Sequence, residues 1–288
     1  MRLGPFDPNN IRVRRGEGGG MGLPIGGGSI GCGTIVIALI AYFVFGADPM
    51  QFLGGGQVSD QGYSRQAGQP GESAAQICSE NQYATEACNA LSSLNDTWRA
   101  VFQNQNVQWH QPELVFYQGG TNSGCGGASS SMGPFYCPND EGIYIDTSFY
   151  DQLAQQLGAK GDFARYYVIA HEYGHHVQKL TGIADQIASA QQQDPRNASR
   201  YQVMMELQAD CYAGVWAGKN RNLIEPGDFE EGMTAASAIG DDTLEKNAGE
   251  AVNPETFTHG TSAQRMTALR TGMQSGDDTA CDKYVQAG

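Results

Sequence analysis

Apolar residues recur at helical spacing along much of the chain, which predicts a mostly helical protein. The segments with this pattern are 90–102, 149–157, 163–180, 201–216, 226–246 and the stretch that follows Thr261. Runs rich in β-branched and aromatic residues predict strands at 111–117 and in two pieces of 133–146, joined by a turn at 139–142. Helices and strands in separate stretches indicate an α+β fold with a small sheet.

A continuous apolar run near the N-terminus predicts one transmembrane helix, at residues 29–50. Its uncharged part, residues 29–45, is about 17 residues long, at the short end for a helix that spans a bilayer. Arginines flank this run on its N-terminal side only. The positive-inside rule therefore predicts a cytoplasmic N-terminus, one crossing of the inner (cytoplasmic) membrane, and a large domain in the periplasm or outside the cell. A cleaved signal peptide is the alternative.

Glycine-rich segments lie on both sides of the apolar run. Residues 1–28 combine arginines with repeated glycines, which predicts a cytoplasmic tail without packed structure. Residues 51–75 are rich in Gly, Gln and Ser and predict a flexible linker. The folded extracytoplasmic domain is then expected to occupy residues 76–288.

The charge of the chain is acidic and unevenly distributed. The formal net charge is −14, although residues 1–28 carry an excess of arginine. An acidic domain argues against nucleic-acid partners and against electrostatic binding to anionic lipid. The expected partners are a peptide or protein substrate and, through one helix, the membrane. Composition leaves the oligomeric state open.

Six of the seven cysteines lie in the expected folded domain, and an even number outside the cytoplasm favours disulfides. Six cysteines allow 15 pairings. Spacing makes two local pairs the simplest and leaves one long-range pair: Cys78–Cys88, Cys125–Cys137 and Cys211–Cys281. The last pair would join the C-terminus to the helix over 201–216. Free buried cysteines are the alternative.

The clearest chemistry lies in a His-Glu-x-x-His motif. On a helix, His171 and His175 are four residues apart and share one face, so both imidazoles can bind one metal ion. Glu172 lies beside the first histidine, where a carboxylate can take a proton from a metal-activated water. We expect Asp162 to cap this helix and Gly182 to end it. Chance histidines on an ordinary helix are the alternative.

A catalytic zinc ion usually has three protein ligands and one open position. Glu206 and Asp210 are four residues apart on another predicted helix, where carboxylates among apolar residues need a partner or a metal. We expect Glu206 to be the third ligand and Asp210 to orient one histidine through its other ring nitrogen. Solvated surface carboxylates are the alternative. The rival ligand, His176, points about 100° away from its neighbour and fits a nearby polar role better. Ser199 and Gln202 predict a capping box.

Several separated motifs follow one another along the chain. H-E-Y-G-H-H-V-Q begins at His171, and E-L-Q-A-D-C-Y-A-G-V-W begins at Glu206. G-P-F-Y-C-P at 133–138, G-D-D at 240–242 and H-G-T-S-A-Q-R at 259–265 accompany them. With the Arg-rich start and the apolar run, they make nearly the whole chain similar to the bacterial family of neutral zinc metallopeptidases with one N-terminal membrane segment. The resemblance implies a zincin-like fold, one zinc ion per chain and a glutamate as third ligand.

The resemblance also suggests residues that contact the substrate. In zincin-like folds a strand edge beside the metal helix binds the substrate backbone, a role open here to Phe135–Tyr136 or Ile143–Ile145. A donor that is not a ligand commonly steadies the oxyanion. His259 is the candidate by position and by likeness to the family pattern, and a structural role is the alternative. Arg265 either pairs with a buried carboxylate such as Asp210 or faces solvent.

Three further residues in the C-terminal region are expected to cap helices. Thr261 can cap the helix that follows it. Asp241 and Asp242 are also expected to cap a helix, because two adjacent acids lack the ligand spacing of a calcium loop.

These features predict zinc-dependent hydrolysis of peptide bonds, with Glu172 as the base. One alternative is a catalytically inactive, zinc-containing peptide-binding or scaffold protein of the cell envelope. Another is a chaperone-like pseudoprotease that binds peptides without cleaving them. A structural zinc ion usually has four protein ligands, whereas only three are evident in this sequence.

Overall fold

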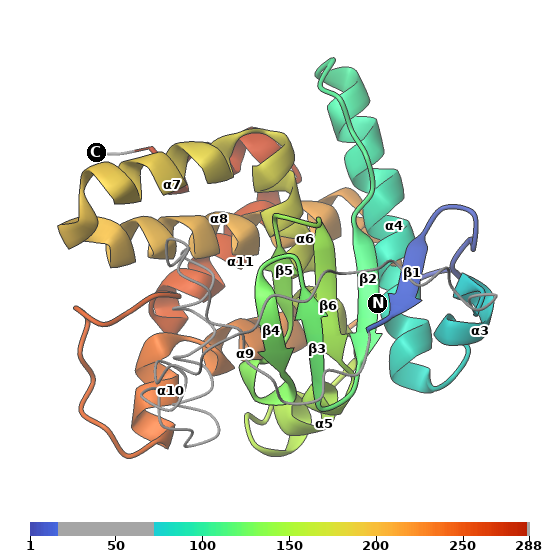
Figure 1. Cartoon of the computed structure of the whole chain (residues 1–288), viewed down its shortest axis with the longest axis horizontal. Coiled ribbons are helices and arrows are strands. Elements are labelled where there is room, and N and C mark those ends of the chain that lie inside the picture. Colours follow the sequence, from blue (N-terminus) through green and yellow to red (C-terminus); the bar gives the residue numbers. More distant parts are fainter. Residues whose placement is uncertain (17–71, 287–288) are drawn as a thin grey trace, which may run out of the picture.

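The computed structural model describes residues 1–16 and 72–286 (Figure 1). The transmembrane helix predicted at 29–50 therefore lies outside the described residues, as does nearly all of the linker predicted at 51–75. No helix within the described ranges combines the length and the apolar character that a membrane crossing requires.

The described part of the chain is α+β and mostly helical, with a small sheet, as the sequence pattern predicts. Its α-helices are α3 (Ala74–Cys78), α4 (Gln82–Asn104), α5 (Ser148–Gln155), α6 (Asp162–Leu180), α7 (Ile183–Gln193), α8 (Ala198–Lys219), α9 (Asp228–Ala238), α10 (Asp241–Asn247) and α11 (Ser262–Ser275). Short 3-10 turns are η1 (Ser130–Met132), η2 (Pro195–Asn197), η3 (Arg221–Leu223) and η4 (Asp278–Tyr284).

The main sheet has four strands in the order β1 (Arg12–Arg15), β2 (Glu113–Tyr117), β6 (Gly142–Asp146) and β5 (Phe135–Cys137). The first three are parallel, and β5 runs antiparallel to β6 across the predicted turn. A separate hairpin joins β3 (Gly120–Ser123) to β4 (Gly126–Ser129).

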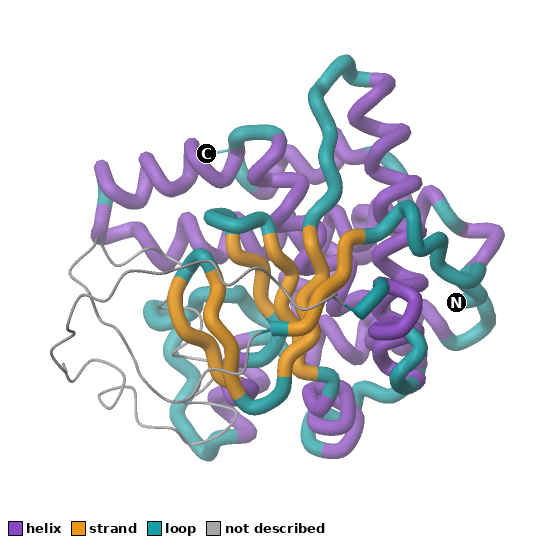
Figure 2. Tube along the Cα trace, turned by 45° about the vertical axis from the view of Figure 1, so that its right-hand side comes forward, coloured by secondary structure: helices purple, strands orange, loops and turns teal. Residues whose placement is uncertain are grey.

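The two faces of the sheet have different neighbours because side chains alternate along each strand. Leu114 and Ile143 point into the core shared with the helices, which lie behind the sheet in Figure 2. Val115 and Tyr144 point to the other face, where a smaller apolar cluster includes Phe135 and contacts the β3–β4 hairpin.

Small residues let three long helices approach one another closely. A Cβ atom on Gly174 of α6 would lie 2.8 Å from the backbone oxygen of Ala209 in α8. A Cβ atom on Gly272 of α11 would lie 2.0 Å from the backbone oxygen of Cys211, also in α8. Larger side chains at these positions would separate the helices. Both α6 and α11 therefore pack directly against the backbone of α8.

The three disulfides join the pairs that spacing suggested, and the prediction is confirmed. They are Cys78–Cys88, Cys125–Cys137 and Cys211–Cys281. The last one attaches η4, near the C-terminus, to α8. Bridges of this kind restrict the unfolded chain most when they close a long loop.

The N-terminal segment corrects one prediction from composition. Residues 1–28 were expected to lack packed structure, but residues 1–16 pack on the domain, with Met1 and Ile11 buried. Strand β1 extends the sheet, and Val13 pairs with Leu114. The glycine content of the whole segment conceals a short alternation of apolar and basic residues at 11–15, which is a strand pattern. Residues 17–28 lie outside the described ranges.

Helix boundaries differ from the predicted ones in two places. The N-cap of α6 is Gly161, and Asp162 is the first helical residue. Helix α8 begins at Ala198, so Ser199 lies inside the helix and forms no capping box. The predicted cap at Thr261 is confirmed, because its hydroxyl accepts a hydrogen bond from the backbone N–H of Gln264.

The packing of the N-terminal segment can be tested by truncating Ile11, which is 5% exposed. In the full-length protein in detergent, Ile11→Ala should lower the free energy of unfolding by about 2 kcal/mol or more, because it leaves a cavity. Val252→Ala is the matched control, since Val252 is 40% exposed. Thermal unfolding measures both variants. Equal melting temperatures would contradict the packing of residues 1–16 on the domain.

Candidate metal centre

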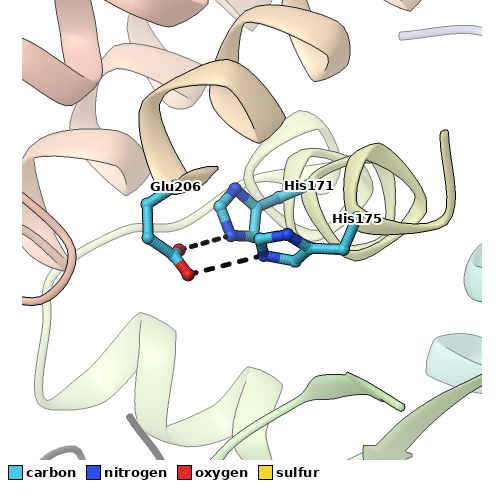
Figure 3. A group of neighbouring side chains, drawn as sticks. All are labelled: His171, His175 and Glu206. Atoms are coloured by element: carbon cyan, nitrogen blue, oxygen red, sulfur yellow. Dashed lines mark hydrogen bonds and ion pairs between the residues drawn. The ribbon is translucent and has the colours of Figure 1, made fainter. Parts of the chain in front are cut away.

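Helices α6 and α8 bring the three predicted metal ligands together (Figure 3). His171 and His175 project from one face of α6 toward Glu206 of α8. The Nε2 atom of His171 lies 3.1 Å from one carboxylate oxygen of Glu206, and Nε2 of His175 lies 3.6 Å from the other. One ligand atom from each residue falls within 4.8 Å of the others. His171 and Glu206 are buried.

The hydrogen bonds at the far side of each imidazole show that this group fits a zinc ion. Nδ1–H of His171 donates to Asp210 at 2.7 Å, because a carboxylate can only accept. Nδ1 of His175 is 2.9 Å from the side-chain oxygen of Gln178, which also accepts. Both Nε2 atoms therefore face Glu206, and each can give up its proton to bind a metal ion. Two imidazole nitrogens and one carboxylate oxygen form a donor set that zinc binds in catalytic sites.

Asp210 lies in a buried cluster of charges behind His171. Arg265 of α11 donates two hydrogen bonds to its carboxylate, at 2.8 and 2.9 Å, and the hydroxyl of Tyr167 donates a third at 2.6 Å. Burial favours a neutral carboxyl, but Arg265 and His171 outweigh it and hold the pKa of Asp210 below its usual value. The structure thus places Asp210 where it orients His171. It also confirms the predicted pairing of Arg265 with a buried carboxylate.

Glu206 is a carboxylate in spite of its burial. Burial alone raises its pKa, but the charge of His175, the hydrogen bond from His171 and the charge of His259 together hold the pKa well below its usual value. An anionic Glu206 can therefore accept a cation between itself and the two imidazoles.

Glu172 lies next to the first histidine and is 8% exposed. Burial raises the pKa of this carboxyl above its ordinary value, and the charges of His171 and His175 oppose that rise. A base whose pKa is moderately raised accepts a proton more readily and can still release it later in a reaction. The environment of Glu172 therefore suits proton transfer.

His259 lies in a loop that packs against the first half of α8. A Cβ atom on the next residue, Gly260, would lie 3.1 Å from Val203 of α8, one turn before Glu206. Nδ1–H of His259 donates to Asp241 at 2.9 Å. Its Nε2 atom is buried and has no hydrogen-bond partner among the described residues. The ring lies close enough to Glu206 for its charge to lower the pKa of that carboxyl.

Asp241 is a site residue that the sequence interpretation missed. Its carboxylate accepts the backbone N–H groups of Thr258, His259 and Gly260, at 2.7–2.9 Å, in addition to the imidazole. It therefore holds both the loop and the ring. The expected capping role describes Asp242 better, because Asp242 accepts the backbone N–H of Ser262 at the start of α11. The hydrogen bond that reveals this role joins two residues 18 positions apart in the sequence. Local sequence patterns do not show a contact at that separation.

His176 is not in the group of three possible ligands, in agreement with the helix geometry. Its Nε2–H donates to the backbone oxygen of His110 at 2.8 Å, so Nδ1 accepts from the hydroxyl of Tyr136 at 3.0 Å. Burial lowers the pKa of His176 to about 4, which keeps the ring neutral. This neutral histidine connects α6 to strand β5.

The strand contacts decide between the two candidate substrate edges. Strand β6, with Ile143–Ile145, lies between β2 and β5, so both of its edges are already paired and this alternative is wrong. Strand β5, with Phe135–Tyr136, pairs with β6 on one side and ends the order of the described sheet. Its outer edge remains the candidate.

Comparison with known proteins gives the family of the chain. The family model described as "Putative neutral zinc metallopeptidase" matches residues 5–284. The chain belongs to this family.

The relatives extend over similar lengths. The protein YpfJ of Escherichia coli K12 is 41% identical over 289 residues, which cover 98% of this chain and 97% of the relative. The protein Rv2575 of Mycobacterium tuberculosis H37Rv is 39% identical over 209 residues, covering 68% and 69% of the two chains. Both relatives are described only as uncharacterized proteins. No solved structure matches the chain significantly.

The role of Asp210 can be tested by changing it to an amide. Asp210→Asn should weaken zinc binding about 10- to 100-fold, because His171 loses the carboxylate that fixes its orientation. Tyr167→Phe is the milder control, since it removes a single hydroxyl contact with Asp210. Zinc affinity is measured by competition with a chelator, and thermal unfolding shows whether each variant is folded. Unchanged zinc affinity in folded Asp210→Asn would contradict the assignment.

Proposed function

We propose that this member of the family hydrolyses peptide bonds in a zinc-dependent reaction. The observation that supports this most directly is the joint placement of His171, His175 and Glu206 around one point. Glu172 is close enough for the charges of all three to act on its carboxyl. The three ligands leave room in the usual zinc coordination for a water or substrate atom, as a catalytic site requires. We propose one zinc ion per chain.

A bound zinc ion supplies two effects in such a site, because it lowers the pKa of a water toward about 7 and polarises a carbonyl group. The chain supplies the remaining functions. Glu172 takes the proton from the attacking water and delivers it to the leaving amine. Asp210 keeps the Nε2 lone pair of His171 directed at the site.

His259 is the proposed donor to the developing oxyanion. Asp241 accepts its Nδ1–H, so a ring that carries a second proton presents Nε2–H on the free side. A preorganised donor of this kind stabilises the charge that develops during the reaction. Asp241 acts through His259 and is therefore a positioning residue.

The outer edge of β5 is the proposed contact for the peptide backbone. An extended peptide can add to an open sheet edge by main-chain hydrogen bonds. The hydrogen bond between Tyr136 and His176 ties β5 to the helix that carries the metal ligands. A peptide on this edge would therefore lie at a constant position relative to the site.

We also propose that the domain works outside the cytoplasm, at the membrane. The three disulfides support an oxidising compartment. The acidic charge of the chain is consistent with a domain that does not bind the lipid surface directly.

Replacement of the proposed base should separate metal binding from chemistry. Glu172→Gln should retain zinc and lower peptide cleavage by about 10²-fold or more, because the carboxylate that takes the proton is lost. Glu206→Ala should lose zinc affinity as well as activity. Cleavage of a mixed peptide library and zinc content are measured for the full-length wild type and both variants. Zinc binding without cleavage by the wild type would favour the inactive binding or scaffold protein.

The pair of His259 and Asp241 has a neighbouring control residue. Asp241→Asn should lower kcat about 10²-fold without loss of zinc, because His259 is no longer held as a donor. Asp242→Asn should leave kcat close to that of the wild type, since Asp242 bonds Ser262 and not His259. Steady-state kinetics on one cleaved peptide measure the difference. Equal values of kcat for the two variants would exclude the positioning role of Asp241.

A further inference from the structure

Residues 1–16 form part of the same folded unit as the metal centre. Strand β1 pairs with β2 through four residues, from Arg12 opposite Glu113 to Arg15 opposite Phe116. The backbone N–H of Gly16 continues the pairing and donates to the oxygen of Phe116 at 2.7 Å. Main-chain pairing of this extent makes the segment a component of the sheet.

The segment also satisfies a buried polar group next to the metal helix. The side-chain amide of Asn95, which is fully buried, donates to the backbone oxygen of Asn10 at 2.6 Å. The oxygen of the same amide accepts from the hydroxyl of Tyr173 at 3.0 Å. Tyr173 lies between the two histidine ligands in α6. Loss of the segment would leave a buried donor short of a partner, at a cost of about 1–3 kcal/mol.

Arginines of the segment pair with acidic residues of the domain. Arg14 contacts Glu113 at 2.7 Å, and Arg15 contacts both Glu72 and Glu80. The first described range ends at residue 16 and the second begins at residue 72. The contact between Arg15 and Glu72 brings these two positions close together. Figure 1 shows the same arrangement, with β1 beside α3.

This arrangement does not fit the topology predicted from the sequence, in which the N-terminus is cytoplasmic and the domain lies outside. One crossing would put the N-terminus and the domain on opposite faces of the bilayer, where β1 and β2 cannot pair. The positive-inside rule counts the Lys and Arg residues close to a crossing. Arg14 and Arg15 are paired with carboxylates of the domain, so in the folded protein both arginines lie on the same side of a membrane as the domain.

We propose that residues 1–16 and the metal-bearing domain lie on the same side of the membrane. A cytoplasmic N-terminus with the domain outside, as expected from the sequence, does not allow the pairing of β1 with β2. This inference concerns topology and holds whether or not the metal centre cleaves peptides.

The test uses the full-length protein in cells and single cysteines that react with a maleimide that cannot cross membranes. Gly4→Cys reports on the N-terminal segment, because a Cβ atom there meets no atom within 4 Å. Ala251→Cys reports on an exposed part of the domain. Both reporter variants also carry Cys32→Ser. This change removes the one cysteine of the sequence that is not in the three disulfides, so the maleimide reacts with the reporter cysteine. Labelling is compared in intact spheroplasts and after lysis.

Equal labelling of both reporters in intact spheroplasts is the expected result. Labelling of both only after lysis would also support a shared side, although it would contradict the proposed location outside the cytoplasm. Labelling of Ala251→Cys in intact spheroplasts and of Gly4→Cys only after lysis would overturn the inference. The Ile11→Ala variant gives an independent measurement, because it reports whether the segment is packed at all.

Discussion

The buried carboxylate of Asp210 is the interaction on which the metal centre depends. It lies on α8, accepts from Tyr167 and His171 of α6, and binds Arg265 of α11 through two hydrogen bonds. Burial of an unpaired carboxylate costs roughly several kcal/mol of folding free energy, because the group loses its hydration. These contacts offset that cost. One charge network thus joins three helices and sets the direction of one metal ligand.

The two variable positions of the His-Glu-x-x-His motif have structural roles of their own. Tyr173 reaches Asn95 in α4 with its hydroxyl, while Gly174 allows the backbone of Ala209 to lie against α6. The close approach at Gly174 is what brings Glu206, one turn earlier on α8, within reach of both imidazoles. Packing and chemistry therefore depend on the same turn of helix.

The N-terminal segment reaches this turn through a single buried amide. Asn95 bonds Asn10 on one side and Tyr173 on the other, so the segment contributes to the order of the helix that carries the ligands. The segment also covers the edge of β2, which would otherwise present unpaired backbone groups. This explains why a basic, glycine-flanked stretch belongs to the folded unit.

The sequence by itself determined the features that depend on local geometry. His171 and His175 share a face because a helix has 3.6 residues per turn, and the cysteine pairs follow largely from spacing. Only the tertiary structure decided which strand has an open edge, that Asp241 holds His259, and that residues 1–16 join the sheet. These contacts link positions far apart in the chain. Their stability comes from burial and pairing in the assembled fold, which a local pattern of residues does not encode.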